Sequence, residues 1–378
     1  MPKRLDAEHG IICRLPTERL GYFGWPSVAR LDDGTLVAVS SGLRSEHICP
    51  WGKTVLNVST DGGRSWTAPR VINDSPLDDR DAGVVSLGGD RFLVTWFTSD
   101  TRQYARADWV RERWGADEWA AWEVTLSTWT DELVRQWLGS WIILSEDRGA
   151  TWSAPIRVPV STPHGPILLA NGELLYLGKH FGKQVAGLGE IETGAILAMR
   201  SADGGRTWEA LGQVPIYPGT KTTNYHEPHV AELASGKLVG MIRLENAGAD
   251  DVTKAGLVHF SMMQTESADG GRTWSVARPL GFHGSPPHLL RHSSGVLLLA
   301  YGYRQAPYGQ RVAISRDDGA TWDHDWILRD DGPDGDLGYP ASVELDDGSL
   351  LTVYYQKVPG DARCSLLCSR WTLPGYCL

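Results

Sequence analysis

The chain is 378 residues long and carries a formal net charge of −10, with an isoelectric point near 5.6. This balance offers no basic stripe to neutralise phosphates, which argues against a nucleic-acid partner. The sequence starts without the apolar core of a signal peptide and contains no run of about 18 apolar residues, so we expect a cytoplasmic protein with no membrane contact.

The cysteine pattern points the same way. The five cysteines, an odd number without a CxxC pair, are Cys13, Cys49, Cys364, Cys368 and Cys377. Such a pattern favours free thiols in a reducing compartment and does not predict a metal site. We expect no cofactor, and no pattern in the sequence indicates an oligomeric state.

An outer strand near the start of the chain, around residues 10–14, is expected to pair with residues 364–371 close to its end. Between them the sequence repeats an apolar strand, a turn containing glycine and a second apolar strand, which is a hairpin signal. The six copies span residues 26–39, 83–96, 165–177, 228–241, 287–300 and 340–353. Six hairpins predict an all-β, six-bladed β-propeller formed by residues 1–378 as a single domain.

A second repeat, Ser-x-Asp-x-Gly-x-x-Trp, follows each of the first five hairpins. Its copies begin at Ser59, Ser145, Ser201, Ser267 and Ser315. The Asp accepts hydrogen bonds from the turn, the Gly supplies a positive φ and the Trp buries its ring over the turn, so the repeat indicates a fold rather than a chemistry. These phrases resemble the Asp boxes of the sialidase superfamily, whose propeller blades carry them on the face opposite the active site.

One segment, about residues 100–139, interrupts the repeat between the second and third strands of blade two. It is rich in Trp, and its apolar residues recur every three or four positions, which predicts one or two amphipathic helices. We expect a helical insertion that rises from the face holding the mouth of the central axis, either as a cap on the rim or as a lid over a pocket.

The propeller topology assigns particular side chains to this mouth face. Those expected there are Trp25, Asp81, His164, Glu227, His288 and Tyr339 from first strands, Arg44, His180, Arg243 and Arg304 from second-strand ends, and Arg311 from a third-strand start. Glu227 and Arg243 stand 16 residues apart at the two ends of one hairpin, so we expect their side chains to be neighbours.

The resemblance to sialidases gives four of these residues a role. In that family a Glu of blade four pairs with a Tyr of blade six, and three Arg bind the substrate carboxylate; Glu227, Tyr339, Arg243 and Arg311 look like the matching positions. A phenol is a poor nucleophile until a carboxylate takes its proton, and a neutral nucleophile is not repelled by an anionic sugar. Sialidases are known as the Tyr-nucleophile exception among glycosidases.

The sequence also departs from the family. The blade-one phrase that should hold the first Arg reads Phe-Gly-Trp-Pro at residues 23–26, with Trp25 as a stacking surface for a sugar, and Arg44 is the nearest replacement for the missing charge. The loop expected to hold the acid/base Asp, residues 45–53, has none, which leaves Glu46, His47 and Asp81 as candidate proton donors. His164 and His288 add polar lining or a general base.

Three interpretations remain open. The chain is a sialidase-like hydrolase that releases a terminal acidic sugar from an oligosaccharide or glycoside, a hydrolase or lyase of neutral or uronate-containing glycans that uses Glu227 and the histidines, or a carbohydrate-binding propeller without catalysis.

Overall fold

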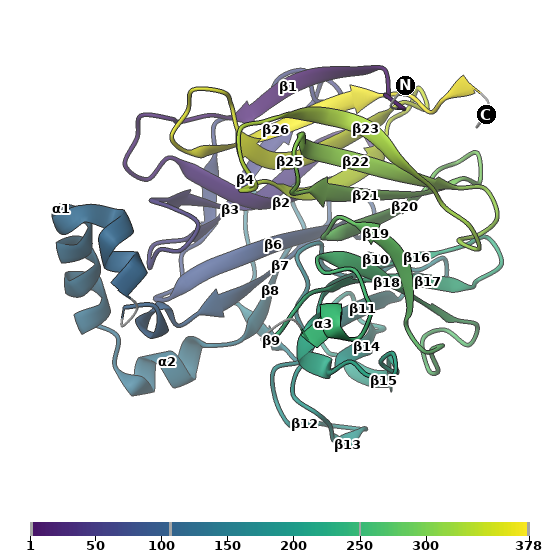
Figure 1. Cartoon of the computed structure of the whole chain (residues 1–378), viewed down its shortest axis with the longest axis horizontal. Helices are drawn as coiled ribbons and strands as arrows, with labels where there is room; N and C mark the ends of the chain where they lie inside the picture. The colour runs from purple at the N-terminus through teal and green to yellow at the C-terminus, as the bar shows by residue number, and fades with distance from the viewer. Residues whose placement is uncertain (1–2, 106–107, 249–250, 376–378) are drawn as a thin grey trace.

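The structure is a computed structural model that describes residues 3–105, 108–248 and 251–375. It contains six four-stranded antiparallel sheets, which confirms the six-bladed β-propeller (Figure 1). The first strand of each blade lies innermost, and these inner strands contact one another around the ring, as β2 (Tyr22–Arg30) does with β6 (Asp78–Ser86) and β24 (Gly338–Glu344). Side chains packed between neighbouring blades form the core.

The first three blades contain twelve strands in chain order. They are β2 with β3 (Leu36–Arg44), β4 (Lys53–Ser59) and β5 (Arg70–Asn73); β6 with β7 (Phe92–Ser99), β8 (Ser140–Ser145) and β9 (Ile156–Val158); and β10 (Ile167–Leu168), β11 (Leu174–Lys179), β14 (Ile196–Ser201) and β15 (Glu209–Gln213). A two-stranded ribbon, β12 (Gln184–Val185) and β13 (Gly189–Glu190), projects between β11 and β14.

The last three blades follow the same order, with one exception at the end. They are β16 (Tyr225–Glu232), β17 (Leu238–Leu244), β18 (Ser261–Ser267) and β19 (Arg278–His283); β20 (Pro287–Arg291), β21 (Leu297–Tyr303), β22 (Tyr308–Ser315) and β23 (Asp323–Gly332); and β24, β25 (Leu350–Lys357), β26 (Cys364–Trp371) and β1 (Ala7–Cys13). A short 3₁₀ helix, η2 (Thr222–Asn224), precedes β16, and α3 (Asp251–Lys254) lies between β17 and β18.

The exception is the outer strand of blade six, which comes from the N-terminal part of the chain, as the sequence predicts. β1 runs antiparallel to β26, with Gly10 opposite Cys368. The pairing joins segments about 350 residues apart and completes the sixth blade, so that the ring is closed by hydrogen bonds.

The Asp boxes form the turns between the third and fourth strands. In the third copy, the Asp203 carboxylate accepts hydrogen bonds from the backbone N–H of Arg206 and Thr207, both at 2.9 Å, and from the Thr207 hydroxyl. The indole N–H of Trp208 donates to the carbonyl of Gly205 at 3.0 Å. Each carboxylate is thus satisfied inside its own turn, which leaves it no partner role in chemistry.

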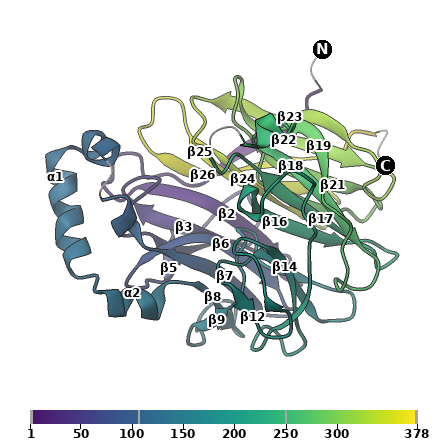
Figure 2. The same ribbon diagram turned by 60° about the horizontal axis from the view of Figure 1, so that its bottom comes forward.

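The insertion of blade two is helical, and it lies to one side of the sheets in both ribbon views (Figures 1 and 2). Between β7 and β8 it forms η1 (Thr101–Gln103), α1 (Asp108–Ser127), which is interrupted at Gly115, and α2 (Asp131–Trp137). Trp122 of α1 packs with Cys49 of the loop after β3, and the Trp51 indole donates to Thr125. The insertion therefore supports the loop at residues 45–53, in the manner of a cap on the rim.

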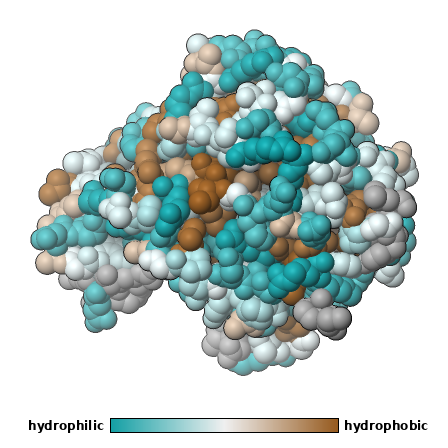
Figure 3. All heavy atoms as spheres, turned by 90° about the horizontal axis from the view of Figure 1, so that it is seen from above, coloured by the Kyte–Doolittle hydropathy of each residue, from teal (hydrophilic) through white to brown (hydrophobic). Residues whose placement is uncertain are grey.

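Much of the apolar surface on the face seen in Figure 3 gathers toward its centre, with polar side chains around it. Within the described residues, none of the helices combines the length and the apolar character that crossing a membrane requires. Cys13, Cys49, Cys364 and Cys368 are free and buried, whereas Cys377 lies outside the described residues.

Candidate active site

Four inner strands have the same irregularity at the same position. The ladder pairing with the second strand skips residues between Gly24 and Ser27, Arg80 and Gly83, His226 and His229, and Gly338 and Ala341. In each gap lies one non-glycine residue with left-handed backbone angles: Trp25 (φ 53°), Asp81 (φ 51°), Glu227 (φ 48°) and Tyr339 (φ 52°). Such conformations cost about 1–3 kcal/mol each and cluster at functional sites, so this ring of bulges marks the mouth of the axis.

Glu227 and Tyr339 meet across the axis. The Tyr339 hydroxyl donates to Oε1 of Glu227 at 2.5 Å, although blades four and six are separated by blade five. Arg243, at the end of β17, donates to Oε2 of Glu227 at 2.7 Å and lies 3.4 Å from the Tyr339 oxygen. The hairpin argument therefore places Arg243 correctly, and the guanidinium bridges both groups.

The electrostatics of this trio assign the proton to the phenol. Burial and the neighbouring Glu227 carboxylate raise the pKa of Tyr339 well above its usual value. Burial alone would raise the pKa of Glu227, but Arg243 and the hydrogen bond from Tyr339 outweigh it and hold the pKa below the usual value. At neutral pH the pair is a neutral phenol beside an ionised base, with Arg243 to balance the charge.

A second arginine at this site is Arg304, which follows β21 at the second-strand end of blade five. Its guanidinium carbon lies 5.9 Å from the centre of the Tyr339 ring and 4.9 Å from that of Phe260, a ring that Arg243 also contacts at 4.7 Å. Its hydrogen bonds go to neutral groups, the Leu337 carbonyl at 3.0 Å and the Tyr355 hydroxyl at 3.5 Å. Sequence reasoning placed Arg304 on the mouth face and gave it no role.

Arg311, which sequence reasoning chose instead, lies elsewhere. It is 4% exposed, and its guanidinium donates to the carbonyls of Arg329 (2.9 Å) and Pro307 (3.0 Å) within blade five. The structure thus places the Arg311 donors on backbone carbonyls of its own blade, and a contact of Arg311 with substrate stays a prediction.

Asp81, the bulge residue of blade two, is a carboxyl group suited to proton transfer. It is 7% exposed, and one of its oxygens is buried without a hydrogen-bond partner. Burial and the nearby Glu227 raise the pKa of Asp81 to about 7, against the opposing charge of Arg80. A carboxyl with this pKa is partly protonated at neutral pH and can donate a proton as well as accept one.

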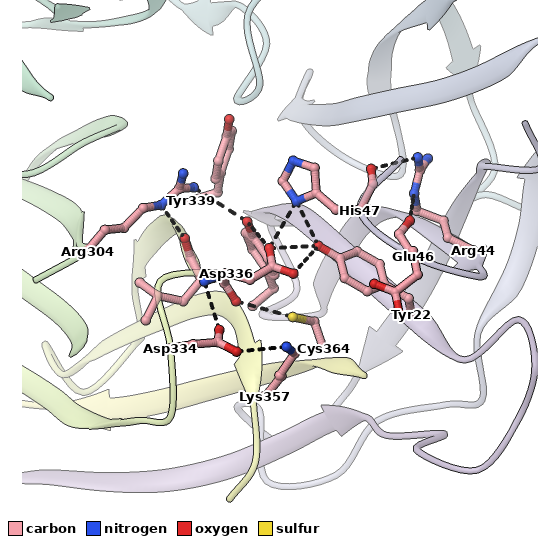
Figure 4. A network of polar contacts seen from close by, with 12 residues as sticks. Tyr22, Arg44, Glu46, His47, Arg304, Asp334, Asp336, Tyr339, Lys357 and Cys364 are labelled. Carbon is pink, nitrogen blue, oxygen red and sulfur yellow. Dashed lines mark hydrogen bonds and ion pairs between the residues drawn. The ribbon is translucent and has the colours of Figure 1, made fainter. Parts of the chain in front are cut away.

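His47 belongs to a hydrogen-bonded network centred on Asp336, a residue that sequence reasoning missed (Figure 4). The Asp336 carboxylate lies 2.9 Å from Nδ1 of His47 and accepts the hydroxyls of Tyr22 (3.0 Å) and Tyr355 (3.2 Å). Desolvation lowers the pKa of His47, which Asp336 only partly offsets. A neutral His47 that donates from Nδ1 presents a lone pair at Nε2, and Figure 4 shows its ring on the same side of the network as the Tyr339 phenol.

Arg44 and Trp25 lie behind the site. Arg44 is 0% exposed, and its guanidinium is held by the Asp78 carboxylate at 2.5 Å and by backbone carbonyls. Trp25 is 1% exposed, with the guanidinium carbons of Arg44 and Arg80 at 4.9 Å and 4.2 Å from its ring centre. Both side chains are buried in this structure, so the expectations that Arg44 binds substrate and that Trp25 stacks on a sugar stay predictions that its geometry does not favour.

The remaining candidates are dispersed. Glu46 lies 3.7 Å from Arg363 and so points toward blade six. His164 and His288 are buried at 2% and 8% exposure and pack with His229, at ring-centre distances of 4.4 to 5.5 Å within the trio. Burial lowers the pKa of all three imidazoles, so they form a neutral core rather than a charged lining. Within the described residues, no group of three or more His, Cys, Asp or Glu is arranged to hold a metal ion.

Comparison with known proteins agrees with this architecture. The family described as BNR repeat-like domain matches residues 118–352. A sialidase of Bacteroides fragilis is 25% identical over 357 residues, which cover 89% of this chain and 60% of that protein. The chain thus spans less than two thirds of the length of this relative.

Solved structures share the fold over nearly the whole chain. A protein of unknown function from Dyadobacter fermentans has a TM-score of 0.73 at 23% identity, with 97% of this chain and 98% of that one covered. The intramolecular trans-sialidase of Ruminococcus gnavus has a TM-score of 0.63 at 18% identity, with 94% and 95% covered. An alpha-L-arabinofuranosidase of Fusarium graminearum has a TM-score of 0.60 at 11% identity, with 97% and 98% covered. These likenesses extend to proteins that act on different sugars.

Proposed function

Because the chain belongs to the BNR repeat-like domain family, in a sialidase-like propeller fold, we propose that it is a glycoside hydrolase that releases a terminal acidic sugar. Tyr339 is the nucleophile and Glu227 is its base. The observation that carries the proposal is the 2.5 Å hydrogen bond from the Tyr339 hydroxyl to Glu227, with Arg243 in contact with both.

The geometry supports a two-step reaction. In the first step the Tyr339 oxygen bonds to the anomeric carbon, Glu227 takes the phenol proton, and the bond to the leaving oxygen breaks as that oxygen is protonated. In the second step water attacks the anomeric carbon, and the Tyr339 oxygen leaves and recovers its proton from Glu227. A nucleophile that is neutral before reaction avoids repulsion from the acidic group of the sugar.

Asp81 is the best of the three candidate proton donors. Because its pKa is about 7, the Asp81 carboxyl is partly protonated at neutral pH. It also interacts electrostatically with Glu227 and with Tyr339. His47 is neutral and presents an acceptor, and Glu46 is turned toward Arg363. Asp81 therefore protonates the leaving oxygen in the first step and takes a proton from water in the second.

Arg304 is the group that recognises the acid of the substrate. Arg243 already pairs with Glu227 and with Glu245, at 2.7 Å and 2.5 Å, whereas the hydrogen bonds of Arg304 go to neutral partners. A half-buried guanidinium beside the nucleophile gains most from a carboxylate. The sialidase family binds the substrate carboxylate with three arginines, whereas this site offers the guanidinium of Arg304. The sugar is therefore held partly by other contacts.

The test is a release assay with aryl glycosides of sialic acid, glucuronic acid, arabinose and rhamnose. Tyr339→Phe and Glu227→Gln should each lower kcat for the acidic substrate by about 10³-fold or more. The first variant removes the proposed nucleophile, and the second removes its base. Tyr301→Phe, which removes a buried phenol hydroxyl from the outer part of blade five, is the matched control. Wild-type turnover by Tyr339→Phe, or a preference for the neutral glycosides, would contradict the proposal.

The His47–Asp336 pair favours one alternative, a lyase that acts on uronate-containing glycans. A neutral imidazole held at Nδ1 by a carboxylate is the type of base that removes the proton next to a uronate carboxyl group. A lyase forms an unsaturated uronate that absorbs ultraviolet light, and its activity depends on His47. A product without this absorbance rejects the alternative, and binding without turnover of any substrate indicates a carbohydrate-binding propeller.

A further inference from the structure

Five of the six blades have a basic residue at or next to the end of the second strand. Three of these side chains pair with carboxylates, as Lys357 of blade six does with Asp334 at 2.8 Å. The other two are Lys179 of blade three and Arg304 of blade five. Among the residues that the structure describes, neither has a carboxylate at ion-pair distance: Lys179 contacts an imidazole, and Arg304 a carbonyl and a hydroxyl.

Lys179 is connected to Glu227 by a chain of polar contacts. Its Nζ lies 3.0 Å from Nδ1 of His226, the residue before Glu227. On the other side of the imidazole, Nε2 lies 3.5 Å from Oε1 of Glu245, whose other oxygen accepts from Arg243 at 2.5 Å. Arg243 in turn donates to Glu227 at 2.7 Å. Lys179 thus belongs to the same polar cluster as the base of the proposed reaction.

The contact with His226 does not satisfy the ammonium of Lys179. Burial and the charge of Lys179 lower the pKa of His226 to about 4, so the imidazole is neutral at neutral pH and Nδ1 accepts from the ammonium. An ammonium has three N–H donors, and His226 takes one of them. The Lys179 side chain is 7% exposed, so bulk water compensates little of its charge.

Lys179 is nevertheless mostly charged at neutral pH. Burial lowers its pKa to about 8, and the carboxylates of Glu227 and Glu245 oppose this decrease. Both carboxylates are already paired with Arg243, so neither is the direct partner of the ammonium. A buried ammonium without a carboxylate partner is destabilising, and an anionic ligand that binds it would offset this.

Lys179 and Arg304 lie on either side of blade four. The inner strand of blade four, which carries Glu227, contacts blade three on one side and blade five on the other. The guanidinium carbon of Arg243, also from blade four, lies 4.7 Å from the centre of the Phe260 ring, which Arg304 contacts at 4.9 Å. The two cations are thus at separate places around Glu227, and each can bind an anionic group of its own.

We propose that Lys179 binds a second anionic group of the substrate, so that the substrate carries two acidic groups close together. The inference rests on the proposed function, in which Arg304 binds the first acid. The second group is either an ester such as a sulfate on the same sugar ring or the carboxylate of the neighbouring ring. Both present anionic oxygens that accept hydrogen bonds from an ammonium.

The kinetic test measures the preference for a doubly charged substrate, as the ratio of its kcat/KM to that of a singly charged one. The reference is the aryl glycoside of the acidic sugar that the release assay selects. One comparison substrate adds a sulfate ester to the same ring, and the other links the same sugar to a second acidic sugar. The wild-type protein should prefer at least one of them about tenfold, and Lys179→Met should remove this preference. The preferred substrate shows which ring carries the second acid.

Lys53→Met is the matched control. Lys53 begins β4 at a third-strand start, on the mouth face, but its ammonium is paired with the carboxylate of Asp74. This variant should keep the wild-type preference. The absence of a preference in the wild-type protein, or a preference that survives in Lys179→Met, would overturn the proposal.

Binding of selenate, a sulfate analogue, separates this inference from the proposed reaction. Anomalous scattering from crystals soaked in selenate should show an anion at Nζ of Lys179 in the wild-type protein and none there in Lys179→Met. The measurement needs no turnover, so it tests the Lys179 site even if Tyr339→Phe retains activity or no glycoside is cleaved. Wild-type crystals without selenate at Lys179, or selenate that stays in place in the variant, would contradict an anion site.

Discussion

The two faces of the propeller use the same residue types in opposite ways. On the Asp-box face, carboxylates such as Asp203 lie near solvent and accept hydrogen bonds from their own turn, which brings the pKa of Asp203 to about 2 despite some opposing desolvation. On the mouth face, burial opposes the charge of both Asp81 and Glu227; the pKa of Asp81 is raised to about 7, whereas Arg243 holds the pKa of Glu227 below its usual value. Repetition thus identifies the carboxylates that stabilise the fold, and in the proposed function the unrepeated carboxylates carry the chemistry.

The backbone shows the same contrast. In the boxes, left-handed angles are mostly taken by glycine, as at Gly204 and Gly205, where they cost little. At the mouth they are taken by Trp25, Asp81, Glu227 and Tyr339, for which they are strained. A large side chain retained in a strained conformation indicates that its position is required.

The strongest test of this contrast is to substitute two arginines of blade five, Arg304 and Arg311, one at a time. Arg304→Ala should lower kcat/KM for an acidic glycoside about 100-fold, because it removes the guanidinium that, in the proposed function, binds the substrate acid. The methyl ester of the same substrate should lose much less. Arg311→Lys, whose native hydrogen bonds go to backbone carbonyls, should stay within about twofold of wild type. A larger effect at Arg311 than at Arg304 would restore the sequence-based assignment.

The pH dependence of kcat/KM should reflect the mouth carboxylates. The proposed reaction needs ionised Glu227, whose pKa is below the usual value, and protonated Asp81, whose pKa is about 7. Activity should therefore be highest in mildly acidic solution and fall about tenfold per pH unit above 7. Asp81→Asn should remove the alkaline decline together with most of the activity. A decline that persists in this variant would assign it to another group.

Asp81 also allows the strain to be measured. Asp81→Gly relieves a left-handed residue and removes a buried oxygen without a partner, so the free energy of unfolding in urea should rise by about 1 kcal/mol while activity is lost. The matched control is Asp81→Ala, which removes the carboxyl and keeps the strain. Equal stability of the two variants would show that the backbone there is not strained.

The smallest effect is expected on the opposite face. Asp203→Ala should lower the free energy of unfolding by about 1 kcal/mol, because it removes the acceptor of the turn, and leave kcat unchanged. The folded-state pKa of Asp203 is below that of an unfolded Asp, so its contribution is present above pH 4 and is lost as the pH falls toward 2. Urea titrations of wild type and variant should converge in that interval.

The fold was accessible from the sequence because its signals are local and repeated. The Gly turns and Asp boxes define six blades, and the β1–β26 pairing follows from counting strands. Glu227 and Arg243 were accessible for the same reason, since one hairpin connects them. The helical insertion was visible as a break in the repeat, although its contact with the loop at residues 45–53 was not.

The rest of the site depends on side-chain direction and burial, which strand counting does not give. Arg304 and Arg311 both lie on blade five, and only packing shows that one faces Tyr339 and the other the backbone. Arg44 and Trp25 occupy mouth positions, yet their side chains turn inward. Asp336 lies in a loop without a repeat signal, and the phenols of Tyr22 and Tyr355 that surround it come from different blades.

The pairing of β1 with β26 also sets an order of events during synthesis. The ribosome makes β1 first and β26 about 350 residues later. Before β26 is synthesised, β1 has no strand of blade six to pair with, and the ring of blades is incomplete. Closure then brings blade six against blade one, where Tyr339 lies beside Trp25.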